Sequence, residues 1–205
     1  MTEQNRPLRG RPQRTEQQIA EMRAKISACA LQLFKEEGFE AISMRRLAKE
    51  VGLTPMTLYK YFDSKVDILR SLWAEIFAEL CVELKQIAAQ TFEPRARLQA
   101  VALRYVTYWQ DNPENYFLGF MTKGISQTDV RGFVEDDATL AWFDVLRDSL
   151  AAALGAIAQP ALRLKSELLL CILNGIAHNL ITISSYPWSE PKDLTCTAID
   201  GLLDG

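Results

Sequence analysis

The residue types that carry most enzyme and metal chemistry are scarce and scattered in this chain. Its 205 residues include one histidine, His178, so a site that needs two histidine ligands is excluded. A Ser–His–Asp triad would have to use His178, and no Gly-x-Ser-x-Gly turn is present to expose a serine nucleophile. The glycines are dispersed, and no glycine-rich phosphate loop occurs. We therefore expect a protein that is not an enzyme and holds no cofactor and no metal.

The four cysteines indicate neither zinc binding nor a redox pair. Cys29, Cys81, Cys171 and Cys196 are far apart in sequence, and none belongs to a Cys-x-x-Cys pair. We expect all four to be buried free thiols in a reducing compartment.

The polar start of the chain and its hydropathy predict a soluble, cytoplasmic protein with no membrane partner. The first residues read Met-Thr-Glu-Gln-Asn-Arg-Pro, which does not resemble a signal peptide. The longest strongly apolar run, Leu168–Leu173, is far shorter than the roughly 18 residues that span a bilayer.

Charge is divided unevenly along the chain. The net charge of −3 by itself argues against a nucleic-acid partner. However, residues 1–70 hold 13 basic and 9 acidic residues, whereas residues 71–205 hold 10 basic and 17 acidic residues. The average therefore hides a basic amino-terminal segment joined to an acidic remainder.

Apolar residues recur at helical spacing along nearly the whole chain, and no segment shows the alternation of a strand. The fold class we expect is all-α with about nine helices. Residues 125–134 are mixed in composition and the hardest to assign. The expected helices cover about 15–37, 44–51, 55–62, 64–87, 94–110, 113–124, 135–157, 161–184 and 191 onward.

Helix starts are marked by capping residues. Thr15, Ser43, Thr54 and Ser64 each precede an apolar periodic segment, and a hydroxyl there can accept a backbone N–H of the first turn. Pro55 follows Thr54 at a first helical position, where no backbone donor is needed.

Residues 44–62 have the pattern of a helix-turn-helix. Two short helices flank a turn at Gly52, and Ala48 is small enough to let the second helix cross closely. The second helix of such a pair can enter the major groove of DNA, which is about 12 Å wide. The expected inner face consists of Leu47, Ala48, Val51, Leu58 and Phe62.

The stretch from Val51 to Lys65, VGLTPMTLYKYFDSK, resembles the signature of the TetR family of transcriptional regulators. Phe34, Gly38-Phe39 and the segment 42–48 also fit that family. The resemblance covers about residues 15–70 and implies three parts. These are a flexible Arg-rich arm (1–14), a three-helix, helix-turn-helix DNA-binding domain (15–63), and a helical ligand-binding and dimerisation domain (64–205).

The resemblance also implies roles for individual residues on double-stranded DNA. Residues at the start of the first helix of the pair touch backbone or a base edge, residues around the second helix face the groove floor, and others contact phosphates. The candidates for contact with backbone or a base edge are Ser43 and Arg45, and those that face the groove floor are Thr54, Pro55, Met56 and Thr57. The candidates for phosphate contact are Tyr59, Tyr61 and Lys65. Lys60 could reach a guanine or a phosphate.

The expected recognition face lacks Arg, Asn and Gln, the side chains that make bidentate contacts with bases. We infer that DNA shape carries part of the specificity. The arm fits this idea, because Arg9-Gly10-Arg11-Pro12 resembles the core of an AT-hook, which binds the narrow minor groove of A·T-rich DNA. A solvated tail is the alternative reading of these four residues.

For the remainder of the chain, the resemblance implies an apolar cavity for a small-molecule effector. Polar residues on otherwise apolar helices are the best candidates for its specific contacts. His178 could instead lie at a dimer seam. The candidate ligand-binding residues are Tyr105, Tyr108, Trp109, Phe117, Phe120, Met121, Thr122, Asn174 and His178.

The segment 161–184 is apolar on nearly every face, and such a helix must be covered all round. A homodimer in which the last two helices pack as a four-helix bundle would cover it. The candidate interface residues are Leu168, Ile172, Ala177, Ile181, Ile199 and Leu202.

Together these patterns predict a dimeric repressor that a small apolar ligand releases from a palindromic operator. An activator of the same fold, a broad nucleoid-type binder, and a helical small-molecule-binding protein or enzyme with a lapsed DNA-binding head are the alternatives. The sequence leaves the operator, the inducer and the regulated genes open.

Overall fold

The computed structural model describes residues 15–126 and 137–204, with the backbone alone for residues 137–140. Every regular element within these ranges is a helix, which confirms the all-α class. The predicted arm and most of the mixed segment 125–134 lie outside the described residues. The helices are α1 (Glu16–Glu37), α2 (Met44–Glu50), α3 (Pro55–Leu58), α4 (Lys65–Gln90), α5 (Pro94–Asp111), α6 (Pro113–Phe120), α8 (Asp137–Leu154), α9 (Gln159–Thr182) and α10 (Pro191–Asp204).

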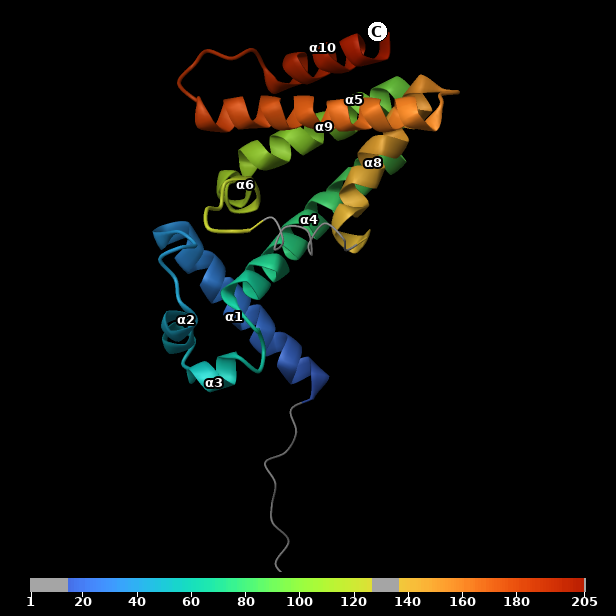
Figure 1. The fold of residues 1–205 in the computed structure, drawn as a ribbon. Coiled ribbons are helices and arrows are strands. Elements are labelled where there is room, and N and C mark those ends of the chain that lie inside the picture. Colours follow the sequence, from blue (N-terminus) through green and yellow to red (C-terminus); the bar gives the residue numbers. More distant parts are fainter. Residues whose placement is uncertain (1–14, 127–136, 205) are drawn as a thin grey trace, which may run out of the picture.

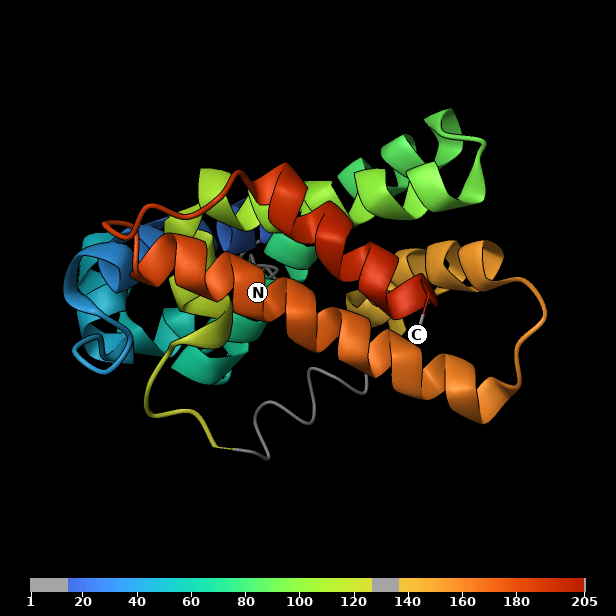
Figure 2. The same ribbon diagram turned by 90° about the horizontal axis from the view of Figure 1, so that it is seen from above.

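The helices form a small head and a larger body. Helices α1, α2 and α3 make the head at one end, and α4 runs from the head into the body (Figure 1). Helix α5 is central to the body, because it packs against α4, α8, α9 and α10. Helices α9 and α10 lie side by side across the end opposite the head (Figure 2).

The predicted caps are confirmed at all four helix starts. The hydroxyl oxygens of Thr15, Ser43, Thr54 and Ser64 each accept a backbone N–H three residues on. Thr15 forms a full capping box, because the side chain of Gln18 accepts the Thr15 N–H in return. These local bonds fix where the head helices begin.

Two helices end earlier than their sequence pattern predicts. Helix α3 stops at Leu58 instead of Phe62, because the N–H groups of Lys60 and Tyr61 bond three residues back, which tightens the last turn. Helix α6 stops at Phe120 instead of Gly124. The hydroxyl of Thr122 and the indole N–H of Trp73 both donate to the carbonyl of Leu118 there.

The boundary between α8 and α9 also differs from the prediction. Helix α8 ends at Leu154, because Gly155 takes the left-handed conformation (φ +71°) that stops a helix. Helix α9 then begins at Gln159, since Pro160 is tolerated in the first turn. The sequence had suggested that Gln159-Pro160 separates the two helices.

One continuous hydrophobic core joins the head to the body. All five predicted inner-face residues of the helix-turn-helix are buried, including Leu47, Ala48 and Leu58. The buried side of α4 continues from Ile68, beside the head, to Leu84 in the body. Helix α4 therefore belongs to both packing units.

Helix α9 is long and apolar enough to cross a membrane by length and composition, within the described part of the chain. Only 22% of its most apolar window is buried in the single chain. Charged residues nevertheless interrupt it, and Arg163 pairs with Glu167 on its exposed side. The helix packs on α5, α8 and α10, and the face that points away from these three helices is exposed in the single chain.

The prediction of four buried thiols is only partly right. All four cysteines are free, but Cys81 alone is buried, while Cys29 and Cys196 are half-buried. Cys171 is exposed because it lies on the uncovered side of α9.

The close crossing at Ala48 gives a stability prediction. Ala48→Leu should lower the free energy of unfolding by about 1–3 kcal/mol, because the added methylenes have no space between α2 and its neighbours. Ala74→Leu is the matched control, since Ala74 is exposed on α4. Thermal denaturation should show a lower midpoint for the first variant only; equal midpoints would mean that the crossing is not tight.

Candidate functional site

The head exposes one set of side chains on and directly after α3. Pro55, Met56, Tyr59 and Lys60 are exposed, and Met56 is 78% exposed although it is a large apolar residue. Thr57 is half-buried beside them. An exposed apolar side chain on a short helix with an aromatic and a lysine suits contact with a groove edge and its phosphates.

Two predicted contact residues also serve as caps. The Ser43 oxygen accepts the Arg46 N–H, and the Thr54 oxygen accepts the Thr57 N–H. The Thr54 and Thr57 hydroxyl oxygens lie 2.8 Å apart, so one of these hydroxyls donates a hydrogen bond to the other. The Ser43 hydroxyl proton remains available to donate to a phosphate, because a cap uses only the oxygen lone pair.

The two neighbouring arginines of α2 have different surroundings. Arg46 forms ion pairs with Glu37 at 2.7 Å and Glu50 at 3.1 Å, and these hydrogen bonds raise the pKa of its guanidinium. Arg45 is exposed and makes no ion pair within the described ranges. Arg45 therefore stays a candidate for DNA contact, whereas Arg46 stabilises the head.

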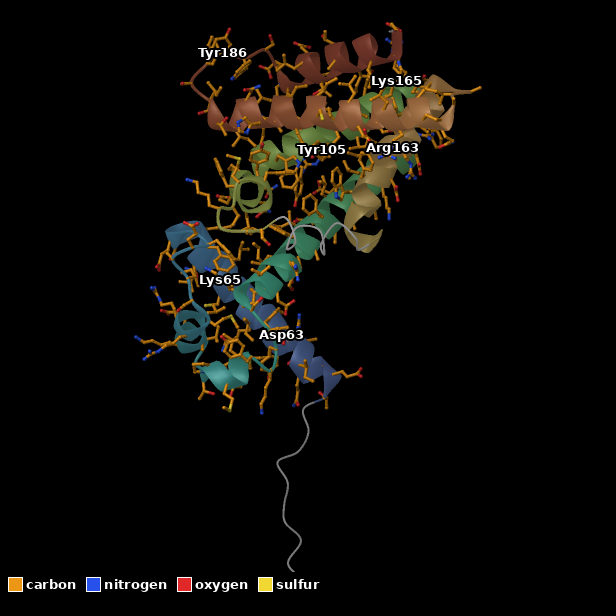
Figure 3. The ribbon with its side chains drawn as sticks, in the orientation of Figure 1. Asp63, Lys65, Tyr105, Arg163, Lys165 and Tyr186 are labelled. Carbon is orange, nitrogen blue, oxygen red and sulfur yellow. The ribbon has the colours of Figure 1, made fainter. Side chains whose placement is uncertain are left out.

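The structure contradicts the assignment of Tyr61 and Lys65 to phosphate contact. Tyr61 is only 6% exposed, because it packs in the core behind α3. Lys65 is half-buried, and its Nζ donates to the carbonyls of Phe39 (3.0 Å) and Ile42 (3.2 Å) while it lies over the Phe39 ring. Figure 3 labels Lys65 inside the head, where α4 begins. Lys65 thus holds the loop between α1 and α2.

Arg23 is a residue of the head that the sequence did not point to. It donates to the carbonyl of Tyr61, and its guanidinium lies 4.1 Å from the centre of the Phe62 ring. Arg23 therefore ties α1 to the segment that follows α3 and helps to orient the exposed residues. No local pattern signals a contact between residues 38 positions apart.

In the body, several predicted ligand residues pack into an aromatic cluster, which we define by Phe77, Tyr105, Tyr108, Trp109, Tyr116, Phe120 and Trp142. Trp142 stacks on Phe77 (5.5 Å between ring centres) and on Tyr105 (5.4 Å). Tyr105, Tyr108 and Trp109 are fully buried. In this structure the protein's own rings fill the space among α4, α5, α6 and α8.

Polar contacts link this cluster to α9. The Tyr105 hydroxyl donates to Asn174 at 2.6 Å, and the Tyr116 hydroxyl is 3.0 Å from Nδ1 of His178. Burial raises the pKa of both tyrosines, so their hydroxyls stay protonated. Figure 3 shows Tyr105 directly beneath α9. Asn174 and His178, predicted to share one helix face, therefore both face the cluster.

The structure divides the predicted ligand residues into two groups. Tyr105, Tyr108, Trp109, Phe120, Asn174 and His178 belong to the aromatic cluster or contact it. Phe117, Met121 and Thr122 instead line a cavity between α6 and the end of α1. The sequence placed both groups in one site because it could not show how α6 is turned.

Comparison with known proteins bears on the head and on the whole fold. Residues 26–72 match the model of the family described as bacterial regulatory proteins, tetR family. Residues 26–72 thus carry the TetR-family domain. This confirms the family resemblance, and the matched segment contains α2, α3 and the residues exposed around them.

A similar protein is an HTH-type transcriptional regulator of Staphylococcus aureus (strain USA300). It is 50% identical over 48 residues, which are 23% of this chain and 26% of that protein. The match thus spans about a quarter of the relative, and it says nothing about the body.

Two solved structures share the fold over nearly the whole chain. The regulatory protein SCO4313 has a TM-score of 0.73 at 19% identity, covering 94% of this chain and all of that one. FadR of Bacillus subtilis, solved in complex with stearoyl-CoA, has a TM-score of 0.71 at 16% identity, covering 90% and 98%. At these identities the likeness concerns the fold alone.

Beyond the TetR-family domain, the structure corrects half of the predicted dimer residues. Ala177, Ile199 and Leu202 are buried inside the single chain, because they face α5 and the contact between α9 and α10. Leu168 is 47% exposed, and Ile172 and Ile181 are half-buried. Leu164, which the sequence reasoning missed, is 66% exposed on the same helix.

The different surroundings of two lysines give a prediction about DNA binding. Lys60→Met should weaken DNA binding and reduce the salt dependence by about one counterion, because Lys60 is exposed beside α3. Lys65→Met should leave that slope unchanged and lower stability by roughly 1–2 kcal/mol, since two carbonyls lose a charged donor. Binding titrations at several salt concentrations measure both slopes. A reduced slope for Lys65→Met would restore it as a phosphate contact.

Proposed function

We propose that this protein is a homodimeric transcriptional regulator, and specifically a repressor that a small ligand releases from a palindromic operator. The observation that carries the proposal is the intact TetR-family head. Its caps are formed, its inner face is buried, and Met56, Tyr59 and Lys60 remain exposed around α3. A head that no longer binds DNA does not require an exposed apolar residue, an aromatic residue and a lysine side by side on a well-folded helix-turn-helix.

The proposed reading of DNA relies on methyl contacts and on shape. Met56 and Thr57 can pack against thymine methyl groups, while Arg45, Tyr59 and Lys60 position the head on the backbone. The Ser43 hydroxyl and the first turn of α3, with Thr54 and Pro55, would approach the groove wall. The arm with Arg9 and Arg11 would read an A·T-rich minor groove at the flank.

The proposed homodimer forms through the uncovered face of α9. Leu164, Leu168 and Cys171 are exposed along this helix, and the half-buried Ile172 and Ile181 flank them. A second α9 related by a two-fold axis would cover this face with the same residues. Both heads then point away from the interface (Figure 1), as two recognition helices on one face of a duplex require.

The proposed effector site is the aromatic cluster with its polar links to α9. A ligand with an apolar body would open the stack around Trp142 and compete for the hydroxyls of Tyr105 and Tyr116. Long-chain acyl compounds are reasonable first candidates, since the Bacillus subtilis protein of the same fold was solved with stearoyl-CoA. Moving Trp142 away from Phe77 would shift α8 against α4, and α4 carries the head.

The proposed function assigns the chain no enzymatic activity. Repression follows from occupation of the operator, and release follows if the ligand favours a head spacing that no longer fits successive grooves. A ligand with equal affinity for both spacings would release nothing. Since the family consists of regulators, the effector is a signal here and not a substrate.

Selection from a random duplex library tests DNA recognition. We expect enrichment of an inverted repeat with half-sites one helical turn apart or a whole multiple of it, about 34–36 Å per turn. A·T-rich flanks should be enriched with the full chain and lost when residues 1–13 are removed. Enrichment of no sequence would contradict specific recognition and favour a broad binder.

The dimer interface gives a separate prediction. Leu168→Glu should shift the protein from dimer to monomer and weaken operator binding at least tenfold, because an unpaired carboxylate would be buried in the interface. Val82→Glu is the control, since Val82 is also an exposed apolar residue but lies on α4. Light scattering after size exclusion gives the mass. A dimer that survives Leu168→Glu would place the interface elsewhere.

A further inference from the structure

Three rings of the aromatic cluster form a nearly parallel stack with Trp142 in the middle. The Trp142 ring is inclined by 18° to Phe77 at 5.5 Å and by 21° to Tyr105 at 5.4 Å, measured between ring centres. Trp109 instead meets both Phe77 and Tyr105 edge to face. Trp142 therefore occupies a flat-sided space between Phe77 and Tyr105, which we call the ring slot.

The two walls of the ring slot are anchored more firmly than the ring between them. Tyr105 lies on α5, is fully buried and donates to Asn174 at 2.6 Å. Phe77 lies on α4 and also packs against Trp109. Trp142 comes from α8, and within the described ranges it makes ring contacts but no hydrogen bond. The Trp142 ring can therefore leave the slot with α8, while Phe77 and Tyr105 keep their places on α4 and α5.

A buried donor beside the ring slot has no acceptor. Trp109 is fully buried, and its indole Nε1 has no hydrogen-bond partner. The Tyr105 hydroxyl lies near enough to interact with this N–H, yet the two groups do not reach hydrogen-bond geometry. Buried donors in proteins are nearly always paired, because an unpaired donor costs free energy. A ligand that brings an acceptor to this point would remove that cost.

Within the described part of the chain, the charged side chains that touch the aromatic cluster do so at Tyr108 and not at the ring slot. Arg104 lies 5.6 Å from the centre of the Tyr108 ring and pairs with Glu83 at 2.6 Å and Asp111 at 2.7 Å. Glu79 accepts from the Tyr108 hydroxyl at 3.1 Å. A charged ligand in the slot would lose water without gaining a counter-charge, which costs more free energy than burying a neutral acceptor.

We propose that Trp142 is a plug that the effector replaces, and that the effector is a flat, uncharged aromatic compound with a hydrogen-bond acceptor. Its ring stacks between Phe77 and Tyr105 in place of Trp142, and its acceptor takes the N–H of Trp109. This inference rests on the effector site of the proposed function and narrows the ligand class there. A flexible acyl chain fits such a slot less well, because it loses more conformational freedom and offers no ring face.

Isothermal titration calorimetry of the full chain without DNA tests the shape of the ligand. The probes are 2-acetylnaphthalene and dodecan-2-one, two methyl ketones with the same number of carbon atoms. The flat ketone should bind roughly tenfold more tightly, since its rings stack and few of its bonds lose freedom on binding. Equal or tighter binding of dodecan-2-one would overturn the aromatic class.

The same titration tests the charge of the ligand. Sodium 2-naphthoate keeps the two fused rings but carries a carboxylate, and it should bind roughly tenfold more weakly than 2-acetylnaphthalene, because no free cation meets it in the slot. A carboxylate that binds as well as the ketone would contradict the choice of an uncharged ligand.

Shortening the plug tests whether the ligand takes its place. Trp142→Ala should tighten binding of 2-acetylnaphthalene at least threefold, because the ligand no longer has to displace a ring. Phe143→Ala is the control, since Phe143 is the next aromatic residue of α8 and lies outside the stack, and it should leave the affinity unchanged. Weaker binding to Trp142→Ala would make Trp142 a wall of the site and overturn the plug. Trp142→Leu keeps an apolar side chain for folding and should change the affinity in the same direction.

Removing the unpaired donor tests the acceptor. The wild-type chain should prefer 2-acetylnaphthalene roughly fivefold over 2-isopropenylnaphthalene, which has the same shape but a CH₂ group in place of the carbonyl oxygen. In Trp109→Phe, which keeps a ring but has no N–H, this preference should disappear. A purely structural role of Trp109 would change both affinities by the same factor, and an unchanged preference would therefore overturn the donor assignment.

Addition of the same compounds to the operator complex separates this inference from the proposed function. If dodecan-2-one releases the operator and the naphthalenes do not bind, the ligand class is wrong and the ligand-released regulator stands. If 2-acetylnaphthalene binds as expected but leaves operator affinity unchanged, the plug and the ligand class stand and the proposed release is wrong.

Discussion

The shared burial of α4 is the constraint on which the rest of the structure depends. Its 26 residues carry one buried side that begins against the head at Ile68 and ends within the body at Leu84. Because both packing units use this helix, the head cannot turn without moving apolar side chains in the body. Tightly packed interiors have few alternative arrangements, so such a movement occurs between discrete states rather than by smooth bending.

Helix α6 is the second connection between head and body, and polar contacts hold it from two sides. The Trp73 indole donates to the Leu118 carbonyl at 2.9 Å, Tyr116 meets His178 of α9, and the other side of α6 faces the end of α1. Since buried donors and acceptors are costly to leave unpaired, these contacts fix the rotation of the helix. The same rotation directs Tyr116 and Phe120 onto Trp109 and leaves Phe117 and Met121 in the lining of the cavity at the end of α1.

The sequence predicted the local features of the head well, because their causes lie within a few residues. A threonine or serine directly before a helix can cap its first turn however that helix packs on the rest of the protein. The small side chain of Ala48 likewise allows a close helix crossing within the helix-turn-helix itself. Predictions that depended on orientation failed. Tyr61 and Lys65 belong to a motif near DNA, yet their side chains turn inward, and Ala177 and Leu202 face the chain's own core.

The sequence alone therefore determined the helical class, the caps, the helix-turn-helix with its family, and the basic head on an acidic body. Periodicity, capping and turn residues are properties of short segments. The tertiary structure decided which residues of an apolar helix are exposed, that the aromatic residues fill their own space, and that Arg23 and Lys65 stabilise the head. Those outcomes depend on how helices that are far apart in the chain pack against one another. The spacing of residues within one helix does not reveal which other helix it will contact or through which side.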